Sequence, residues 1–324
     1  MAVTDPFGKA MAVKHWAQLE ERSAIWGMQL LLKVYLLFGR QVLQFFLYPV
    51  VSYYWLINRP GRQASRQYLQ RVSAYLPEQG LQGSAYDSYR HFVSFSNAII
   101  DKLAALSGSI TLQDIEYNGR EAIAEHLRLG HGLLILGSHL GNLEVLRAIA
   151  SLRNDVTVNV LVHTKHAKKF NALLNRNATS SRVNLMQVTG TNAATAMILQ
   201  DKIDAGELVV IAADRTPVTG QDRVSRAIFL GHPALFPQGP FILASLLKCP
   251  VYTLFCLKHQ HRQTIYFDCF SDGIALPRKH SEIAIQKYAQ DYADRLQHYC
   301  LKEPLQWFNF YDFWQAGNDP RNLS

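Results

Sequence analysis

The sequence predicts an α/β fold with a largely parallel central sheet that is flanked by helices. From about residue 109 onward, short runs of β-branched residues and leucine alternate with segments of helical period, which is the pattern of βαβ units. Most of these runs lack polar alternation, as expected for strands that are covered on both faces. A third observation, an apolar stretch near the start of the chain, predicts an N-terminal helical segment that associates with a membrane.

The expected strands and helices follow one another in a regular order. We predict strands at residues 133–136, 156–162, 183–188, 208–213, 251–257 and 265–270. The helical patterns cover residues 120–129, 142–153, 166–176, 192–205 and 239–247, and a long helix at about 281–302 closes the fold. This order assigns residues 1–75 to the membrane-associating segment and residues 76–324 to one α/β domain.

The apolar stretch covers residues 29–57 and reads QLLLKVYLLFGRQVLQFFLYPVVSYYWLI. Its longest charge-free part, residues 41–58, contains Pro49 and is short for a membrane-spanning helix, which needs about 20 apolar residues. Lys33 and Arg40 precede this part and Arg59 and Arg62 follow it, which favours a helix or hairpin lying in the headgroup plane. The alternative is a large buried helix in the core of a soluble protein.

The charge of the chain limits its partners. The formal net charge of +8 is compatible with nucleic acid, an anionic membrane surface or an acidic protein. The sequence has no zinc-finger spacing, no RRM-like aromatic pair and no long basic helix, so we expect no nucleic-acid partner. Its four cysteines show no C-x-x-C spacing, which is typical of reduced core residues in the cytosol, and we expect no metal site. No apolar run follows a basic start, so a cleaved signal peptide is not expected.

One short stretch, LILGSHLGNLE at residues 134–144, places a histidine and a glutamate five residues apart just after an apolar strand. On one continuous helix the two side chains would point about 140° apart and would not meet. They can face each other if His139 precedes a helix that Asn142 caps and Glu144 lies in its first turn. Such a junction is where open α/β sheets place their ligand crevice.

This pairing suggests acid–base chemistry. A carboxylate bonded to one ring nitrogen of a histidine fixes the tautomer and raises the basicity of the other nitrogen. His139, oriented by Glu144, could act as a general base that takes the proton of an acceptor hydroxyl as it attacks a thioester. The alternative is that His139 caps the helix and Glu144 only complements the helix dipole. The residues alone leave both interpretations open.

A family resemblance favours the catalytic interpretation. His139-x4-Glu144 matches the H-x4-D/E signature of the lysophospholipid acyltransferase superfamily, and the chain is most similar to the late acyltransferases of lipid A synthesis. Further blocks follow in the order of that family: a basic segment at residues 163–182, GELVVIAADRTP at 206–217 and FLGHPALFPQGP at 229–240. Other stretches, among them WAQLEERSAIWGMQLLLKVYLLFGR, ASRQYLQRV and WFNFYDFW, resemble a narrower group of predicted acyltransferases associated with aryl polyene-type lipid synthesis. The resemblance covers nearly the whole chain.

The resemblance implies a glycerolipid acyltransferase-like fold and a reaction. A fatty acyl group would move from a thioester on acyl carrier protein or coenzyme A to a hydroxyl of a lipid or glycolipid acceptor, with no cofactor. The location implied is the cytoplasmic face of the bacterial inner membrane, with peripheral attachment or a single anchor. The positive charge favours the acidic carrier protein as donor and attraction to an anionic membrane surface.

Further residues are expected near His139. Asp214 and Arg215 end a predicted strand at the same sheet edge, where they either position the acceptor, support the histidine or form an ordinary ion pair. Arg176 is the best match to the arginine of the family's basic block and could meet a phosphate. The residues expected to complete the substrate site are Ser138, Asn142, Gly231 and Gly239. The two glycines could offer backbone N–H groups to an oxyanion or a phosphate, or could simply form a turn before a helix.

Two other functions are compatible with these residues. A hydrolase could use His139 and Glu144 to activate water, although the chain lacks the G-x-S-x-G motif of the common serine enzymes. A non-catalytic module that binds lipid or an acyl carrier could retain the same fold as a scaffold. Product analysis with and without an acceptor separates the first from a transferase, and replacement of His139 separates the second.

Overall fold

The computed structural model describes residues 22–75, 87–107, 109–142, 156–162, 183–187, 193–216, 223–260 and 262–314. The helices are α1 (Arg22–Ile57), α2 (Arg59–Tyr75), α3 (Ser88–Leu106), α4 (Arg120–Arg128), α7 (Ala193–Asp204), α8 (Gly239–Leu247) and α9 (Ser281–Lys302). The strands are β1 (Ile115–Asn118), β2 (Leu133–Gly137), β3 (Val158–Val162), β4 (Val183–Gln187), β5 (Leu208–Ala212), β6 (Val224–Phe229), β7 (His232–Pro237), β8 (Val251–His259) and β9 (Arg262–Ser271). The helices predicted at 142–153 and 166–176 lie almost wholly outside the described residues.

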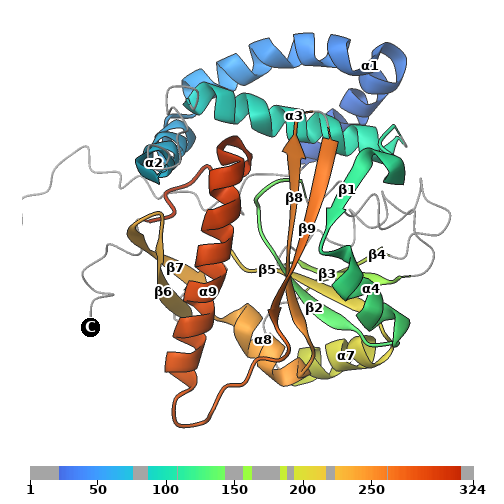
Figure 1. Ribbon diagram of the computed structural model, residues 1–324. Helices are drawn as coiled ribbons and strands as arrows, with labels where there is room; N and C mark the ends of the chain where they lie inside the picture. The colour runs from blue at the N-terminus through green and yellow to red at the C-terminus, as the bar shows by residue number, and fades with distance from the viewer. Residues whose placement is uncertain are drawn as a thin grey trace, which may run out of the picture.

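The central sheet has seven strands in the order β1-β9-β8-β2-β5-β3-β4 (Figure 1). All neighbouring strands run parallel except β8 and β9, which form an antiparallel hairpin. The predicted largely parallel sheet is therefore confirmed, and all six predicted strands are present in it. The edge strand β1 was not predicted, because its four residues are too short for a clear hydrophobic pattern.

Residues 224–237 form a hairpin that was not among the predicted strands. Its strands β6 and β7 make up a second, two-stranded antiparallel sheet in which Phe229 pairs with His232 across the two-residue turn Leu230–Gly231. Both turn residues have positive φ, 50° and 75°, as a type I′ hairpin turn requires. The hairpin was missed because Leu-Gly is not one of the usual residue pairs of that turn.

Helices cover both faces of the central sheet. In β2, Leu134 and Leu136 pack into a large core with side chains of α7, α8 and α9, whereas Leu133 and Ile135 pack into a second core with Ile123 of α4. Every residue of β2 is buried as a result, which explains its apolar sequence without alternation.

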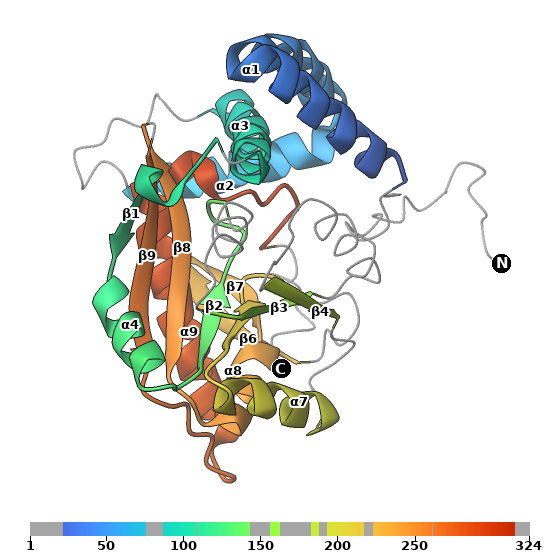
Figure 2. The same ribbon diagram turned by 90° about the vertical axis from the view of Figure 1, so that its right-hand side faces the viewer.

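The N-terminal helices form a layer beside one end of the sheet. α1 and α3 lie side by side at the top of the molecule in Figure 1, and Figure 2 shows the same pairing from the side. Leu43 of α1 is buried against Ile100 and Leu103 of α3. α2 contributes Tyr68 to the large core of the sheet, so its residues share that core with the predicted α/β domain.

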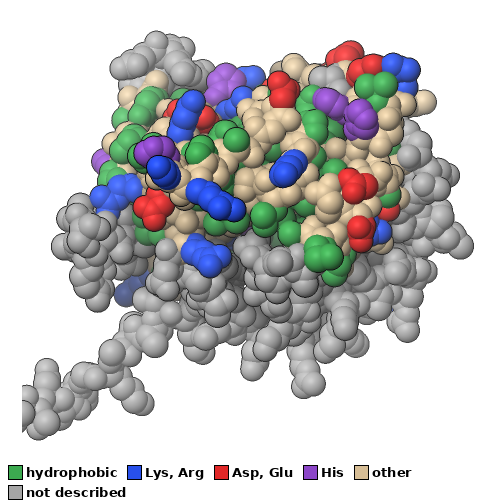
Figure 3. Space-filling model, turned by 90° about the horizontal axis from the view of Figure 1, so that it is seen from below, with side chains coloured by type: hydrophobic (Ala, Val, Ile, Leu, Met, Phe, Trp, Pro, Cys, Tyr) green, Lys and Arg blue, Asp and Glu red, His purple; other side chains and the backbone are tan. Residues whose placement is uncertain are grey.

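The outer face of α1 is apolar and exposed. Within α1, residues Lys33–Ile57 are long and apolar enough to cross a membrane. The exposed large hydrophobic side chains of this part are Leu36, Leu37, Phe38, Val42, Phe45, Phe46, Tyr48, Val50, Tyr53, Tyr54, Leu56 and Ile57. The face of the molecule opposite α1 is different: there, hydrophobic side chains are interspersed with acidic, basic and histidine side chains (Figure 3).

Candidate active site

The site begins where two parallel strands end side by side. β2 and β5 pair in register up to Gly137 and Ala212, and the next N–H along, that of Ala213, donates to the carbonyl of Gly137 at 2.9 Å. The residues that follow these strand ends therefore enter the same space. His139 comes from the β2 side and Asp214 from the β5 side, as their predicted places at one sheet edge required.

His139 and Asp214 are in direct contact. The Nδ1 of His139 lies 2.8 Å from Oδ1 of Asp214, and the backbone N–H of His139 donates to Oδ2 of the same carboxylate at 2.8 Å. An ionised carboxylate can only accept, so the proton of a neutral His139 ring is on Nδ1 and its Nε2 carries a lone pair. Within the described residues, no group bonds to this Nε2, and 34% of the side chain is exposed.

The surroundings of Asp214 favour the ionised form of its carboxylate. It is fully buried, and the indole N–H of Trp307 donates to its Oδ2 at 3.1 Å. Burial by itself raises the pKa of Asp214, but the charge and hydrogen bonds of His139 and the charge of Arg215 outweigh it and lower the pKa to about 2. Asp214 is therefore negatively charged at any physiological pH and can hold the imidazole in one orientation.

The segment that carries His139 is held on both sides. The Oγ of Ser138 accepts the backbone N–H of Leu140 at 3.1 Å, which shapes the turn after β2. Leu140 forms an antiparallel bridge with Trp307, and Gly141 forms a parallel bridge with Cys256 of β8. Gly141 has a φ of 75°, and a Cβ at this position would collide with the carbonyl oxygen of Cys256. Only glycine fits there, so the backbone after His139 follows one path.

A comparison with known families identifies the chain at this point. The family model of bacterial lipid A biosynthesis acyltransferases matches residues 25–316, which include both strand ends and the N-terminal layer. The chain belongs to this family. No curated protein matches the sequence at the level of similarity required. Membership in this family supports acyltransferase activity on lipid A-like acceptors. It also confirms the resemblance inferred from the motifs.

Arg215 contacts the C-terminal segment that lies beside His139. Its guanidinium donates from Nη2 to the carbonyl of Phe308 at 2.8 Å and lies 5.7 Å from the ring centre of Tyr311. The N–H of Phe308 in turn donates to the carbonyl of His139 at 3.0 Å. Arg215 therefore stabilises the C-terminal segment that pairs with residues 138–142, the His139 loop.

Several predicted site residues lie elsewhere or outside the described residues. Glu144 and Arg176 are outside them, so the expected partner of His139 and the expected phosphate contact stay predictions. Gly231 lies in the β6–β7 turn against the hydroxyl of Tyr75, and Gly239 begins α8. Their role as oxyanion donors also stays a prediction. Asn142 follows the bridged segment, and its amide donates to the carbonyl of Ala98 on α3 at 2.8 Å.

Trp307 contacts the candidate site and was not singled out from the sequence. The tail Trp307–Trp314 reads as a plug of the core, and Trp307 is indeed fully buried. Its carbonyl accepts from Nε2 of the buried His91 at 2.9 Å, while the Nδ1 of His91 lies 2.9 Å from the hydroxyl of Ser65. These bonds tie the tail to α2 and α3 while the indole holds Asp214. A tryptophan among other aromatic residues gives no local signal for this role.

A second histidine–carboxylate pair lies at the C-terminal end of β8. The Nδ1 of His259 is 2.6 Å from Oε1 of Glu303, and its Nε2 is 2.7 Å from the hydroxyl of Tyr266. Both nitrogens of His259 are therefore occupied, in contrast to those of His139.

Proposed function

We propose that this chain transfers a fatty acyl group from a thioester, on acyl carrier protein or coenzyme A, to a hydroxyl of a lipid or glycolipid acceptor. His139 is the general base. The observation that carries the proposal is the contact between Nδ1 of His139 and the buried Asp214, which leaves Nε2 with a lone pair at a partly exposed sheet edge.

The proton path follows from this geometry. As the acceptor oxygen attacks the thioester carbonyl, its proton moves to Nε2 of His139, and Asp214 stabilises the imidazolium that forms. The tetrahedral intermediate then collapses, the carbon–sulfur bond breaks, and the thiolate takes the proton back from Nε2. The products are an ester and a free thiol. The side chains of this chain form no covalent intermediate, because the thioester is already activated.

Other residues support these steps. Glu144 is proposed to orient His139 together with Asp214. The groups proposed to lie near the acceptor or the oxyanion are Ser138, Asn142, Arg176, Asp214, Arg215, Gly231 and Gly239. Residues 76–324 would form the acyltransferase domain, and residues 1–75 the segment that associates with the membrane.

The outer face of α1 supports a location on a bilayer. We infer that α1 lies in the headgroup plane of the cytoplasmic face of the inner membrane. Arg40 and Gln44, in the middle of the apolar stretch, bond to Asp101 and Asn97 of α3. A spanning α1 would have to give up these bonds or draw α3 into the bilayer, where such polar side chains are costly. Lying flat keeps them and lets the exposed aromatic side chains enter the interface.

The decisive experiment compares purified wild type with His139→Ala. Both are incubated with a panel of acyl-carrier-protein and acyl-coenzyme A thioesters and total bacterial lipid as acceptor. Free thiol and acylated lipid are followed by mass spectrometry. We expect acylated lipid from wild type and a loss of roughly 10³-fold in its rate of formation for His139→Ala, since a positioned general base contributes about 10²–10⁴-fold.

His259→Ala is the matched control, because it removes a histidine from a similar pair in which both ring nitrogens are occupied. It should retain the wild-type rate to within about three-fold, the size expected of a change outside the active site. Free fatty acid without acylated lipid would favour a hydrolase. Equal rates for His139→Ala and wild type would overturn the role of His139, and inactivity of every protein would favour the binding module.

A further inference from the structure

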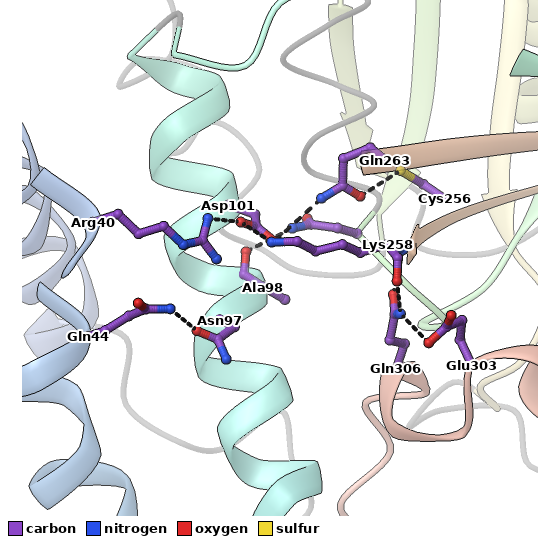
Figure 4. Close-up of polar contacts among 11 residues, drawn as sticks. Arg40, Gln44, Asn97, Ala98, Asp101, Cys256, Lys258, Gln263, Glu303 and Gln306 are labelled. Atoms are coloured by element: carbon purple, nitrogen blue, oxygen red, sulfur yellow. Dashed lines mark hydrogen bonds and ion pairs between the residues drawn. The ribbon is translucent and has the colours of Figure 1, made fainter. Parts of the chain in front are cut away.

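A second buried carboxylate lies between the N-terminal layer and the sheet. The side chain of Asp101 on α3 is 3% exposed. It accepts from Nη1 of Arg40 on α1 at 2.5 Å, from Nζ of Lys258 on β8 at 2.7 and 2.9 Å, and from Nε2 of Gln263 on β9 at 3.4 Å (Figure 4). One carboxylate on α3 thus joins α1 to the β8–β9 hairpin, which lies far from both helices in the sequence.

Lys258 connects Asp101 to the His139 loop along one route. The backbone N–H of Lys258 donates to Oε1 of Gln306 at 2.8 Å, and its carbonyl accepts from Nε2 of the same side chain at 2.7 Å. The backbone carbonyl of Gln306 then accepts the N–H of Gly141 at 2.8 Å. Gly141 is two residues after His139, so a shift of Lys258 moves a direct support of the loop.

A second route runs through Cys256 and α3. The thiol of Cys256 lies 3.7 Å from Oε1 of Gln263, and the carbonyl of Cys256 accepts the N–H of Asn142 at 2.9 Å. The side chain of Asn142 donates to the carbonyl of Ala98, less than one turn before Asp101 on the same helix. Figure 4 shows Ala98 and Asp101 close together on α3, beside Lys258 and Gln263. Both routes meet at Asp101.

The charges make this arrangement specific. Arg40 and Lys258 are two cations that face one buried carboxylate, and they would repel each other without it. A buried ionic cluster of this kind adds little to stability but penalises any arrangement in which a partner is missing. On the α1 side, Arg40 directly follows Gly39, where a φ of 76° interrupts the helix. Gln44 adds a second bond one turn later, to Asn97 at 2.8 Å. These bonds fix how α1 sits on α3.

We propose that Asp101 is a positioning residue that couples the seating of α1 on α3 to the geometry of the His139 loop. This inference rests on the proposed function and deepens it. With α1 seated, Arg40 holds Asp101 against Lys258 and Gln263, and the loop supports are in place for proton transfer. With α1 displaced, Asp101 loses one of its two cationic partners. The hydrogen bonds that hold Gly141 and Asn142 can then shift.

The test uses the full chain with vesicles of anionic phospholipid that carry the acceptor lipid. Arg40→Gln removes the ion pair between Arg40 and Asp101 and leaves the Asp101–Lys258 pair intact. We expect kcat to fall about ten-fold with the KM for the acyl donor within two-fold of wild type, since a misplaced catalytic group lowers turnover and not donor binding. Arg40→Lys should restore at least half of kcat. Asp101→Asn should lower kcat further, and Arg40→Gln carries the test alone if that variant fails to fold.

The matched control is Arg262→Gln, which breaks the exposed Arg262–Glu116 pair, 2.8 Å apart in this structure. Its kcat should equal that of wild type. All rates are measured well below each variant's unfolding midpoint, so that a loss of folded protein does not enter kcat. The inference is overturned if Arg40→Gln keeps wild-type kcat or if its KM for the acyl donor rises by the same factor as kcat falls. It is also overturned if the kcat of Arg262→Gln falls as far as that of Arg40→Gln. Wild type that fails to acylate lipid would instead contradict the proposed function.

Discussion

The two histidine–carboxylate pairs of this chain look alike and differ in what surrounds them. In both pairs Nδ1 lies within 2.8 Å of a carboxylate oxygen, and about a third of each histidine side chain is exposed. Asp214 beside His139 is 1% exposed, whereas Glu303 beside His259 is 28% exposed. The hydroxyl of Tyr266 occupies the second nitrogen of His259, and no described group occupies that of His139.

The comparison teaches that the distance between a histidine and a carboxylate does not identify a general base. What separates the two pairs is a buried carboxylate on one side of the ring and an available nitrogen on the other. His259 has neither feature, so its pair links strands β8 and β9 to the end of α9. His139 has both, at the edge where two parallel strands end.

The largest expected effect tests this difference directly. Asp214→Asn should lower kcat roughly 10³-fold, because an amide can no longer fix the tautomer or stabilise the imidazolium. Glu303→Gln, the matched change in the other pair, keeps an amide oxygen that can accept from Nε2 of Gln306, which lies 3.0 Å from Glu303, and should leave kcat within about three-fold of wild type. Steady-state rates of acylated-lipid formation measure both.

A more than ten-fold loss of kcat for Glu303→Gln would contradict this distinction between the two pairs, since the exposed pair would then affect the reaction. A small loss for Asp214→Asn with normal folding would show that His139 does not depend on this carboxylate. Thermal unfolding of both variants separates these outcomes from loss of the fold.

His91 extends the comparison to stability. Burial lowers the pKa of His91 to about 4, against an ordinary value of 6.5, although its bond to Trp307 acts in the opposite direction. Between pH 6.5 and pH 4 the unfolded chain binds a proton that the folded protein excludes. The free energy of unfolding should therefore fall by about 3 kcal/mol from this group as the pH drops from 7 to 4.

Chemical denaturation at pH 7 and pH 4 measures this fall, and His91→Gln is the control. Glutamine can still donate to the Trp307 carbonyl and accept from Ser65 but does not titrate in this range. The variant should lose less stability on acidification than wild type by about 3 kcal/mol. An identical fall in both proteins would assign the acid sensitivity to other groups.

The fold was largely readable from local patterns. Strands that are buried on both faces have apolar runs, and β2 and β8 are of this kind, so the central sheet follows from the chain. The edge strand β1 is too short for a clear pattern, and the β6–β7 hairpin turns at Leu230–Gly231, which is not one of the usual residue pairs of its turn type. Tertiary contacts decide their structure, since β1 pairs with β9 and β6 packs against α9.

The candidate site was predictable only in part, for a physical reason. Strand order brings His139 and Asp214 to one edge, and both were singled out from the sequence. The bonds that complete the site come from Trp307 and Phe308, whose partners Asp214 and His139 are more than ninety positions away along the chain. No local pattern encodes such contacts, since they depend on how the C-terminal tail packs.

The smallest expected effect concerns Glu144, the carboxylate that the motif pairs with His139. Because Asp214 already accepts the hydrogen bond of Nδ1, Glu144→Gln should lower kcat only about ten-fold, less than Asp214→Asn, by the loss of one charge near the imidazolium. The double variant should be no slower than about ten-fold below Asp214→Asn, since residues that act through one histidine are not additive. A loss for Glu144→Gln equal to or larger than that for Asp214→Asn would reverse the assignment. Glu144 would then orient the base during turnover, and Asp214 would hold the loop in place through the backbone N–H of His139.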